Sequence, residues 1–215
     1  MTPRARDLAG AVAARHVGRA AQGFARGKLR RDPVLPALLA QPPLGDVLDL
    51  GCGRGLIALA LVLAGRARSV TGLDLDTGKI ARAAVAADGL LARFAVADLA
   101  TAEIPPCDTV LLIDVLSQMP PDAQHALLAR ILAVAPARII IRTPDPERGW
   151  RSAVGLAAEH LRRWFGADRA GYRAVAPLLP HDLTAPLEAA GYRIAITPCW
   201  AGTPLPNVLI LAERP

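Results

Sequence analysis

Apolar segments of two kinds alternate along the middle of the chain, and this alternation constrains the fold more than any other feature. Short β-type segments predict strands, and longer segments with helical spacing predict helices. The expected strands are 46–50, 69–74, 92–97, 108–114 and 137–142, and the expected helices are 55–64, 77–87 and 121–134. Residues 110–113 and 139–141 are apolar without interruption, as in parallel strands covered on both faces. The pattern predicts an α/β protein with a doubly wound, mostly parallel sheet.

The alternation lapses after the fifth expected strand. Residues 143–180 are rich in Pro and Arg and contain a predicted helix at 152–165. A helix at 182–190 and two strands at 192–198 and 207–213 are expected after this segment. The short loop between these two strands predicts an antiparallel hairpin, which completes a seven-stranded sheet.

The N-terminal part of the chain precedes the first expected strand. Residues 3–25 read as one helix and residues 33–39 as a short second helix. We therefore expect an N-terminal helical arm at 1–43 and a main domain at 44–215. Within the main domain, residues 143–180 are expected to form an insert on the substrate side.

Composition and cysteine spacing exclude several classes of protein. The longest apolar stretch, residues 56–65, is half the length of a membrane span, and the Arg-bearing N-terminus has no apolar signal-peptide core. The three cysteines have no metal-type spacing, so no metal site is expected, and one of them stays unpaired in any disulfide scheme. These observations predict a protein of the reducing cytoplasm.

The net charge of +6 originates in the N-terminal arm. Residues 1–33 hold eight Arg and Lys against two Asp, whereas residues 34–215 hold 17 basic and 17 acidic groups. Such an arm suits phosphate, an acidic carrier protein or an anionic membrane surface. A solvated helix face with no partner is the alternative.

A glycine-rich turn joins the first expected strand to its helix and carries the clearest functional signal. The turn contains Gly51, Gly53 and Gly55, and Asp74 ends the next strand 23 residues after Gly51. An acid at that place suits two ribose hydroxyls. Leu56 stands where a dinucleotide fingerprint needs Gly or Ala, so a nicotinamide dehydrogenase is disfavoured.

A further acid, Asp49, lies just before this turn and favours a positively charged ligand over a diphosphate. The sequence therefore indicates an adenosine ligand with a positive centre. Purely structural roles remain open: Asp49 as a turn cap, Asp74 or Asp76 as a helix cap, and Asp98 as a loop acid.

Residues 49–55, Asp-Leu-Gly-Cys-Gly-Arg-Gly, resemble motif I of the class I S-adenosylmethionine-dependent methyltransferases. Asp74, residues 97–99 and residues 114–116 resemble the family's later motifs, and the likeness covers residues 44–142. It implies a Rossmann-like fold and S-adenosylmethionine as cofactor. The cofactor-binding residues implied by this resemblance are Asp49, Gly51, Cys52, Gly53, Gly55, Asp74, Leu75, Asp98, Leu99 and Asp114.

Two further segments, 26–33 and 202–209, are similar to small methyltransferases of bacterial aryl-polyene and fatty-acid-like pathways. Many of these relatives carry His where this chain has Ser117, so a familiar contact is missing. The expected function is methyl transfer to a small-molecule acceptor, aromatic or carrier-bound acyl, by in-line displacement. RNA or protein methylation through the basic arm and a non-catalytic cofactor-binding module are the alternatives.

Acceptor-binding residues are expected where strands end, because ligands of open α/β sheets lie at the carboxyl ends of the strands. The catalytic residue is not identified by any motif; His181 and Asp145 are the candidate bases. The expected substrate-side residues are Ser117, Gln118, Arg142, Arg148, Trp150 and Tyr172. An Arg–Asp surface pair and aromatic packing within the insert are the structural alternatives.

Overall fold

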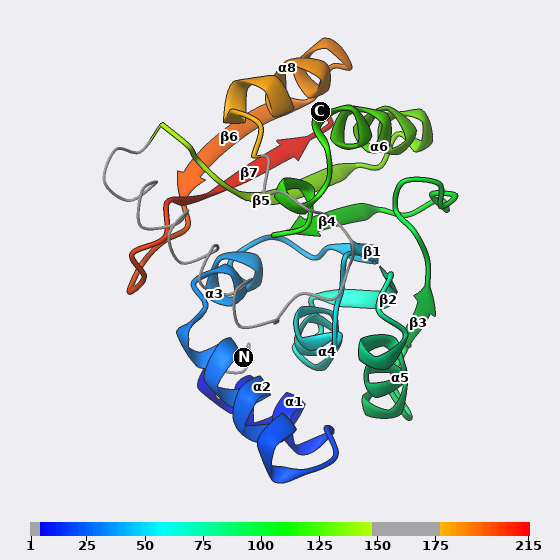
Figure 1. Ribbon diagram of the computed structural model, residues 1–215, viewed down its shortest axis with the longest axis vertical. Coiled ribbons are helices and arrows are strands. Elements are labelled where there is room, and N and C mark those ends of the chain that lie inside the picture. Colours follow the sequence, from blue (N-terminus) through cyan, green and yellow to red (C-terminus); the bar gives the residue numbers. More distant parts are fainter. Residues whose placement is uncertain (1–4, 148–176) are drawn as a thin grey trace. The chain divides into compact units, whose positions relative to one another are not determined.

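Seven strands form one mixed sheet in the computed structural model, in the order β3-β2-β1-β4-β5-β7-β6 (Figure 1). The structure describes residues 5–147 and 177–215. The strands are β1 (Gly45–Leu50), β2 (Ala67–Asp74), β3 (Ala92–Val96), β4 (Thr109–Ile113), β5 (Arg138–Pro144), β6 (Arg193–Pro198) and β7 (Asn207–Glu213). The predicted α/β fold class and all seven predicted strands are confirmed.

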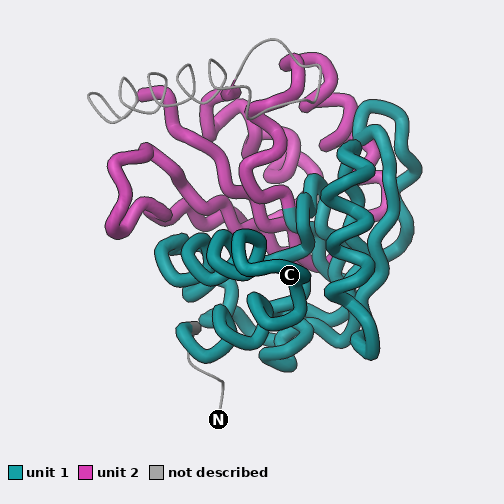
Figure 2. Tube along the Cα trace, turned by 60° about the horizontal axis from the view of Figure 1, so that its bottom comes forward, with its two compact units in different colours: residues 1–111 teal, residues 112–215 magenta. Residues whose placement is uncertain are grey.

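Residues 1–111 and 112–215 form two compact units (Figure 2). The helices of the first unit are α1 (Ala5–Ala14), α2 (Arg19–Arg31), α3 (Val34–Leu39), α4 (Leu56–Leu63) and α5 (Thr77–Ala86). The second unit contains the 3₁₀ turn η1 (Leu116–Gln118) and the helices α6 (Pro121–Val134) and α8 (Pro180–Ala189).

The core of the first unit is built around β1, β2 and α4. β1 pairs in parallel with β2, and β2 pairs in parallel with β3. Residues 56–61 of α4 are all buried, because this helix contacts β2 and β3 as well as α1, α2 and α3. A helix that is covered on all sides must be apolar all round, which is why residues 56–63 contain no polar side chain.

The N-terminal arm differs from the single helix predicted at 3–25. Two helices, α1 and α2, lie side by side, and the chain turns between them at Gly18, whose φ is +92° (Figure 1). Glycine adopts this conformation without steric cost, so the chain can change direction there: α1 ends at Ala14 and α2 begins at Arg19, although the apolar pattern continues. α1 buries Leu8 and Val12 and packs against α4. α2 continues to Arg31, beyond residue 25, where the predicted helix ends.

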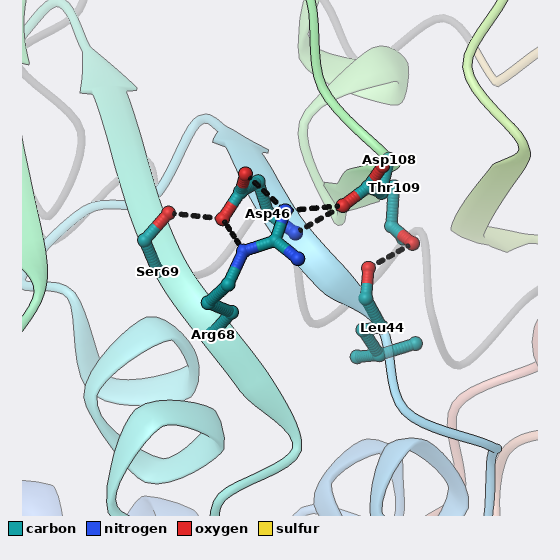
Figure 3. A network of polar contacts seen from close by, with 6 residues as sticks. All are labelled: Leu44, Asp46, Arg68, Ser69, Asp108 and Thr109. Carbon is teal, nitrogen blue, oxygen red and sulfur yellow. Dashed lines mark hydrogen bonds and ion pairs between the residues drawn. The ribbon is translucent and has the colours of Figure 1, made fainter.

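A polar network ties together the amino ends of β1 and β2 and the start of β4 (Figure 3). Arg68 binds Asp46 and Asp108, and Ser69 donates to Asp46 at 2.7 Å. Gly45 has φ +68°, and a Cβ there would lie 2.1 Å from Asp108 Oδ2. The side chain of Arg68 is 65% exposed, so the network contributes little to stability and mainly fixes the register of the chain segments.

The second unit contains the predicted antiparallel hairpin. β7 pairs antiparallel with β5 and with β6, and α8 packs against β6 and β7. Gly191, with φ +86°, follows the C-terminal end of α8, and its N–H donates to the carbonyl of Glu188 at 2.9 Å. The helix expected at 152–165 lies outside the described residues. No helix in the described part of the chain is long and apolar enough to span a membrane.

Candidate functional site

The loop between β1 and α4 is held in an unusual backbone conformation. Gly51, Gly53 and Gly55 all have positive φ, at 76°, 56° and 70°. The N–H groups of Gly51 and Cys52 donate to the carbonyl of Leu73 at 2.7 and 3.1 Å, which fixes the loop against the end of β2. Residues with a Cβ pay a steric cost in this conformation, so the loop requires glycine.

The glycines have two different surroundings. A Cβ on Gly55 would lie 2.6 Å from the ring of Phe94, and one on Gly72 would lie 2.5 Å from the same ring. These two glycines therefore serve close packing. A Cβ on Gly53 would meet nothing nearer than 4.0 Å, and its nearest neighbours are Asp74 and Lys79. Close packing therefore does not require glycine at this position, and we call the place beside Gly53, bordered by Asp74 and Lys79, the Gly53 cradle.

Asp74 lies beside this cradle at the end of β2. Its Oδ2 accepts a hydrogen bond from the N–H of Gly53 at 2.8 Å, and its Oδ1 accepts one from the N–H of Asp76 at 2.9 Å. Asp76, and not Asp74, caps α5 by accepting from the N–H of Lys79 at 2.9 Å. Because each carboxylate oxygen has a second lone pair, Asp74 retains the capacity to accept from ligand hydroxyls. The neighbouring Leu75 is 43% exposed.

Asp49 supplies a second carboxyl group on β1 and is buried, with 3% of its surface exposed. Burial, followed by the negative charge of Asp74, raises its pKa to about 7. A positive centre close to Asp49 would offset both effects, because it favours the ionised carboxylate. Asp74 at the Gly53 cradle and the nearby Asp49 therefore fit a ligand that combines ribose hydroxyls with a positive charge, as S-adenosylmethionine does.

The thiol of Cys52 lies inside this loop. Burial raises its pKa strongly, and the nearby charges of Asp49 and Asp74 add to the effect. The thiolate is therefore not formed near neutral pH, and Cys52 is a small packing residue of the turn.

The third expected motif follows β3. Asp98 accepts from the N–H of Ala100 at 2.9 Å through its side chain, and its carbonyl accepts from Thr101 and Ala102. The side chain of Asp98 is exposed, whereas Leu99 is buried. Asp98 thus shapes a tight turn after β3.

In the second unit, two residues with separately predicted roles form a pair. Arg142 Nε donates to Asp114 Oδ1 at 2.7 Å and a second guanidinium nitrogen contacts Oδ2, so the contact is bidentate. Asp114 has a positive φ of 62°, and its carbonyl accepts from Gln118 at 3.1 Å. The side chain of Arg142 is only 4% exposed. Its guanidinium therefore holds Asp114 in place, and the pair is more buried than the surface pair considered as an alternative.

The remaining predicted residues that the structure describes lie at several places in the second unit. His181 is 72% exposed and pairs with Asp182 at 2.9 Å, at the start of α8. Asp145 is buried, and its Oδ1 accepts from the N–H of Glu147 at 3.0 Å. Ser117 is buried in η1. Three further predicted residues lie outside the described residues, namely Arg148, Trp150 and Tyr172.

The structure also places residues near the loop that the sequence did not indicate. The guanidinium carbon of Arg54 lies 4.7 Å from the ring centroid of Phe24 on α2, which joins the arm to the glycine loop. His16, in the turn between α1 and α2, is 5% exposed, and burial and then the charge of Arg54 lower its pKa. These contacts join residues far apart in sequence, so no local pattern predicts them.

Lys79 lies on the other side of the Gly53 cradle. Its ammonium group is 3.7 Å from Asp76, three residues earlier on the same helix. The spacing of three residues was the only signal for this contact in the sequence. In the described part of the chain, no group of three or more His, Cys, Asp or Glu side chains is arranged to hold a metal ion.

Comparisons with known proteins identify a matching domain and similar folds. Residues 47–136 match a family model described as a methyltransferase domain. Magnesium protoporphyrin IX methyltransferase from Synechocystis PCC 6803, solved with S-adenosylhomocysteine, is similar at 24% identity and a TM-score of 0.63; the match covers 98% of each chain. A methyltransferase from Mesorhizobium loti is similar at 19% identity and a TM-score of 0.64, over 85% of this chain and 96% of that one.

The [4+2]-cyclase SpnF is similar too, at 17% identity and a TM-score of 0.64, over 97% of this chain and 92% of that one. The fold alone therefore does not define the reaction. The match to the methyltransferase family model, with its motif residues, is the evidence for the kind of reaction. Residues 47–136 include Asp49, the glycine loop, Asp74 and Asp114. Residues 47–136 match a methyltransferase domain, and the chain has the fold of solved S-adenosylmethionine-dependent methyltransferases.

Proposed function

We propose that the protein transfers the methyl group of S-adenosylmethionine to a small-molecule acceptor, aromatic or carrier-bound acyl, by in-line displacement. The observation that supports the cofactor site is the pair of nearby carboxyl groups, Asp49 and Asp74, of which Asp74 binds the N–H of Gly53 at the Gly53 cradle. We assign the ribose hydroxyls to Asp74 and the positively charged end of the ligand to Asp49. Leu75, Asp98 and the other cofactor residues expected from the sequence belong to the same proposal.

The chemistry of the reaction places few demands on acid–base groups. The bound cofactor supplies a methyl group on a positively charged sulfur, which departs as a neutral thioether. The protein therefore needs no general acid, and a general base matters only when the acceptor atom begins protonated. The main contribution of the chain is to hold the two reactants in a near-attack arrangement, worth up to about 7–11 kcal/mol in favourable cases.

Three observations support a small acceptor. Residues 34–215 carry no net charge, so a path for a nucleic acid across the main domain is not indicated. The segment after β4 is Asp114-Val115-Leu116-Ser117, which is unlike the Asn-Pro-Pro-Tyr type of base-flipping segment. The similar Synechocystis protein is a magnesium protoporphyrin IX methyltransferase, named for a small-molecule acceptor. We include aromatic acids and acyl intermediates of the aryl-polyene type in the acceptor class.

We also propose that the protein works in the reducing cytoplasm and meets its carrier-bound acceptor through the basic arm. Cys52 and Cys107 are free thiols, which supports a reducing compartment.

The test uses purified protein and S-adenosylmethionine labelled in its methyl group. Aromatic acids, carrier-bound acyl thioesters and total RNA are incubated in separate reactions, and mass spectrometry measures the gain of one methyl group. We expect methylation of a small or carrier-bound compound by the wild type and none by an Asp74→Asn variant. Methyl groups found only in RNA would overturn the acceptor class. Binding of S-adenosylhomocysteine without transfer to any compound would overturn the catalytic role.

A further inference from the structure

Helix α2 presents a dense basic surface that the methyl-transfer site does not use. Its five cationic side chains are all exposed, and the helix contains no acidic residue. In the described ranges of the chain, none of them forms an ion pair. The α2 basic surface consists of Arg19, Arg26, Lys28, Arg30 and Arg31.

The opposite side of α2 fixes this surface in place. Ala25 and Leu29 are buried with 1% exposure, so the helix cannot rotate to hide its cations. Thirteen residues of helix extend over about 20 Å. Arg26 and Arg30 are four residues apart, so their like charges repel each other on one side of the helix. The fold therefore holds uncompensated positive charge on the exposed part of α2, with Arg19, Arg26 and Arg30 on one side of the helix, and an anionic partner would relieve the repulsion.

The surface adjoins the cofactor loop. Phe24 lies among the cations, is 50% exposed, and has the guanidinium of Arg54 over its ring at 4.7 Å. Arg54 belongs to the glycine loop that ends at Gly55. Any partner seated on α2 is thus one side chain away from the loop that holds the cofactor.

We propose that the α2 basic surface docks an acidic carrier protein, which brings the acceptor to the methyl-transfer site; this proposal rests on the proposed function. Arginine guanidinium groups bind carboxylates in a bidentate manner, and four of the five cations are arginine. Arginine and aromatic residues are also enriched at protein interfaces. The surface is one helix long, which matches one acidic helix of a small partner.

A membrane or a nucleic acid fits these observations less well. Phe24, the large apolar side chain on α2, is engaged by Arg54, so it is a poor anchor for insertion into a bilayer. The positive excess of the whole chain is confined to residues 1–33, whereas an extended polymer would need a longer basic path.

The test measures direct binding of a purified, fluorescently labelled acyl carrier protein with its phosphopantetheine arm. Fluorescence anisotropy is recorded at low salt for the wild type and for an Arg26→Glu/Arg30→Glu variant. The matched control is Arg82→Glu/Arg93→Glu, which makes the same change of charge at two exposed residues of α5 and β3. Circular dichroism confirms that each variant is folded.

We expect the α2 variant to bind the carrier protein at least tenfold more weakly than the wild type, because close charge pairs dominate such docking. The control variant should bind the carrier protein with an affinity within about twofold of the wild type. Affinity for S-adenosylhomocysteine should be equal in all three proteins. Equal binding of the carrier protein by both variants would overturn the proposal. Binding of phosphatidylglycerol vesicles or RNA through Arg26 and Arg30, with no binding of carrier protein, would also overturn it.

The two proposals fail in different ways. Carrier binding that depends on α2, with no methyl transfer to any compound, supports the docking surface and rejects the proposed function. Methyl transfer to free acceptors, with no carrier binding, rejects the docking surface and leaves the proposed function intact.

Discussion

The buried carboxyl group of Asp49 makes cofactor binding depend on pH. Burial and the negative charge of Asp74 raise its pKa to about 7, so about half of the apoprotein carries a neutral Asp49 at pH 7. A ligand with a positive centre beside Asp49 binds the ionised form better. If only that form binds, the Kd of S-adenosylhomocysteine is about tenfold higher at pH 6 than at pH 8, because about nine-tenths of the protein must lose a proton at pH 6.

Isothermal titration calorimetry in phosphate and in Tris buffer measures both the affinity and the protons released on binding. We expect release of about half a proton per ligand at pH 7. An Asp49→Asn variant should lose both the pH dependence and the proton release. Asp88→Asn is the control, since Asp88 is an exposed carboxylate after α5. A wild-type Kd that stays constant from pH 6 to pH 8 would refute this reasoning.

Four variants test the stability of the fold and, at Gly53, ligand binding. Asp49→Asn should stabilise the apoprotein, and the gain in unfolding free energy measured in urea should be about 2–3 kcal/mol larger at pH 8 than at pH 5. The reason is that the raised pKa of Asp49 in the folded state makes the wild type lose stability as the pH rises through 7. An equal gain at both pH values would contradict this. Gly53→Ala should lower the unfolding free energy by about 1–2 kcal/mol because of the positive φ of this residue. It should also weaken cofactor binding in calorimetry, since its Cβ enters the Gly53 cradle; normal ligand binding by this variant would argue against the cradle. Gly55→Ala should lower the Tm more strongly than Gly53→Ala, because its Cβ meets the ring of Phe94 at 2.6 Å. Arg142→Met should lower the unfolding free energy by about 2 kcal/mol. This loss is smaller than for a fully buried ion pair, because the side chain of Asp114 is 37% exposed. An unchanged denaturant midpoint would show that the Arg142–Asp114 pair adds no stability.

Local patterns predicted most of the sheet because strand and helix periodicity are properties of short segments. The N-terminal arm was predicted as one helix because glycine occurs at several places in it, at Gly10, Gly18 and Gly23, and only Gly18 takes a positive φ. Glycine within a helix costs little enough to be tolerated, so the sequence does not indicate which one ends it.

In the candidate site, too, local features were predictable from the sequence and long-range contacts were not. The glycine loop was predictable because its positive φ values demand glycine at fixed spacing, and Asp74 follows from the position of the next strand end. The pairing of Arg142 with Asp114 was not predictable, since the two residues are 28 positions apart and meet only when their strands are placed. The contact of Arg54 with Phe24 likewise depends on how α2 packs in the first unit.

The most direct test of the account is a crystal structure of the protein with S-adenosylhomocysteine. We predict that the ligand lies over the Gly53 cradle, with its ribose hydroxyls hydrogen-bonded to Asp74 and its amino group on the side of Asp49. A ligand bound elsewhere, or a nicotinamide dinucleotide bound in this loop with higher affinity, would contradict the account.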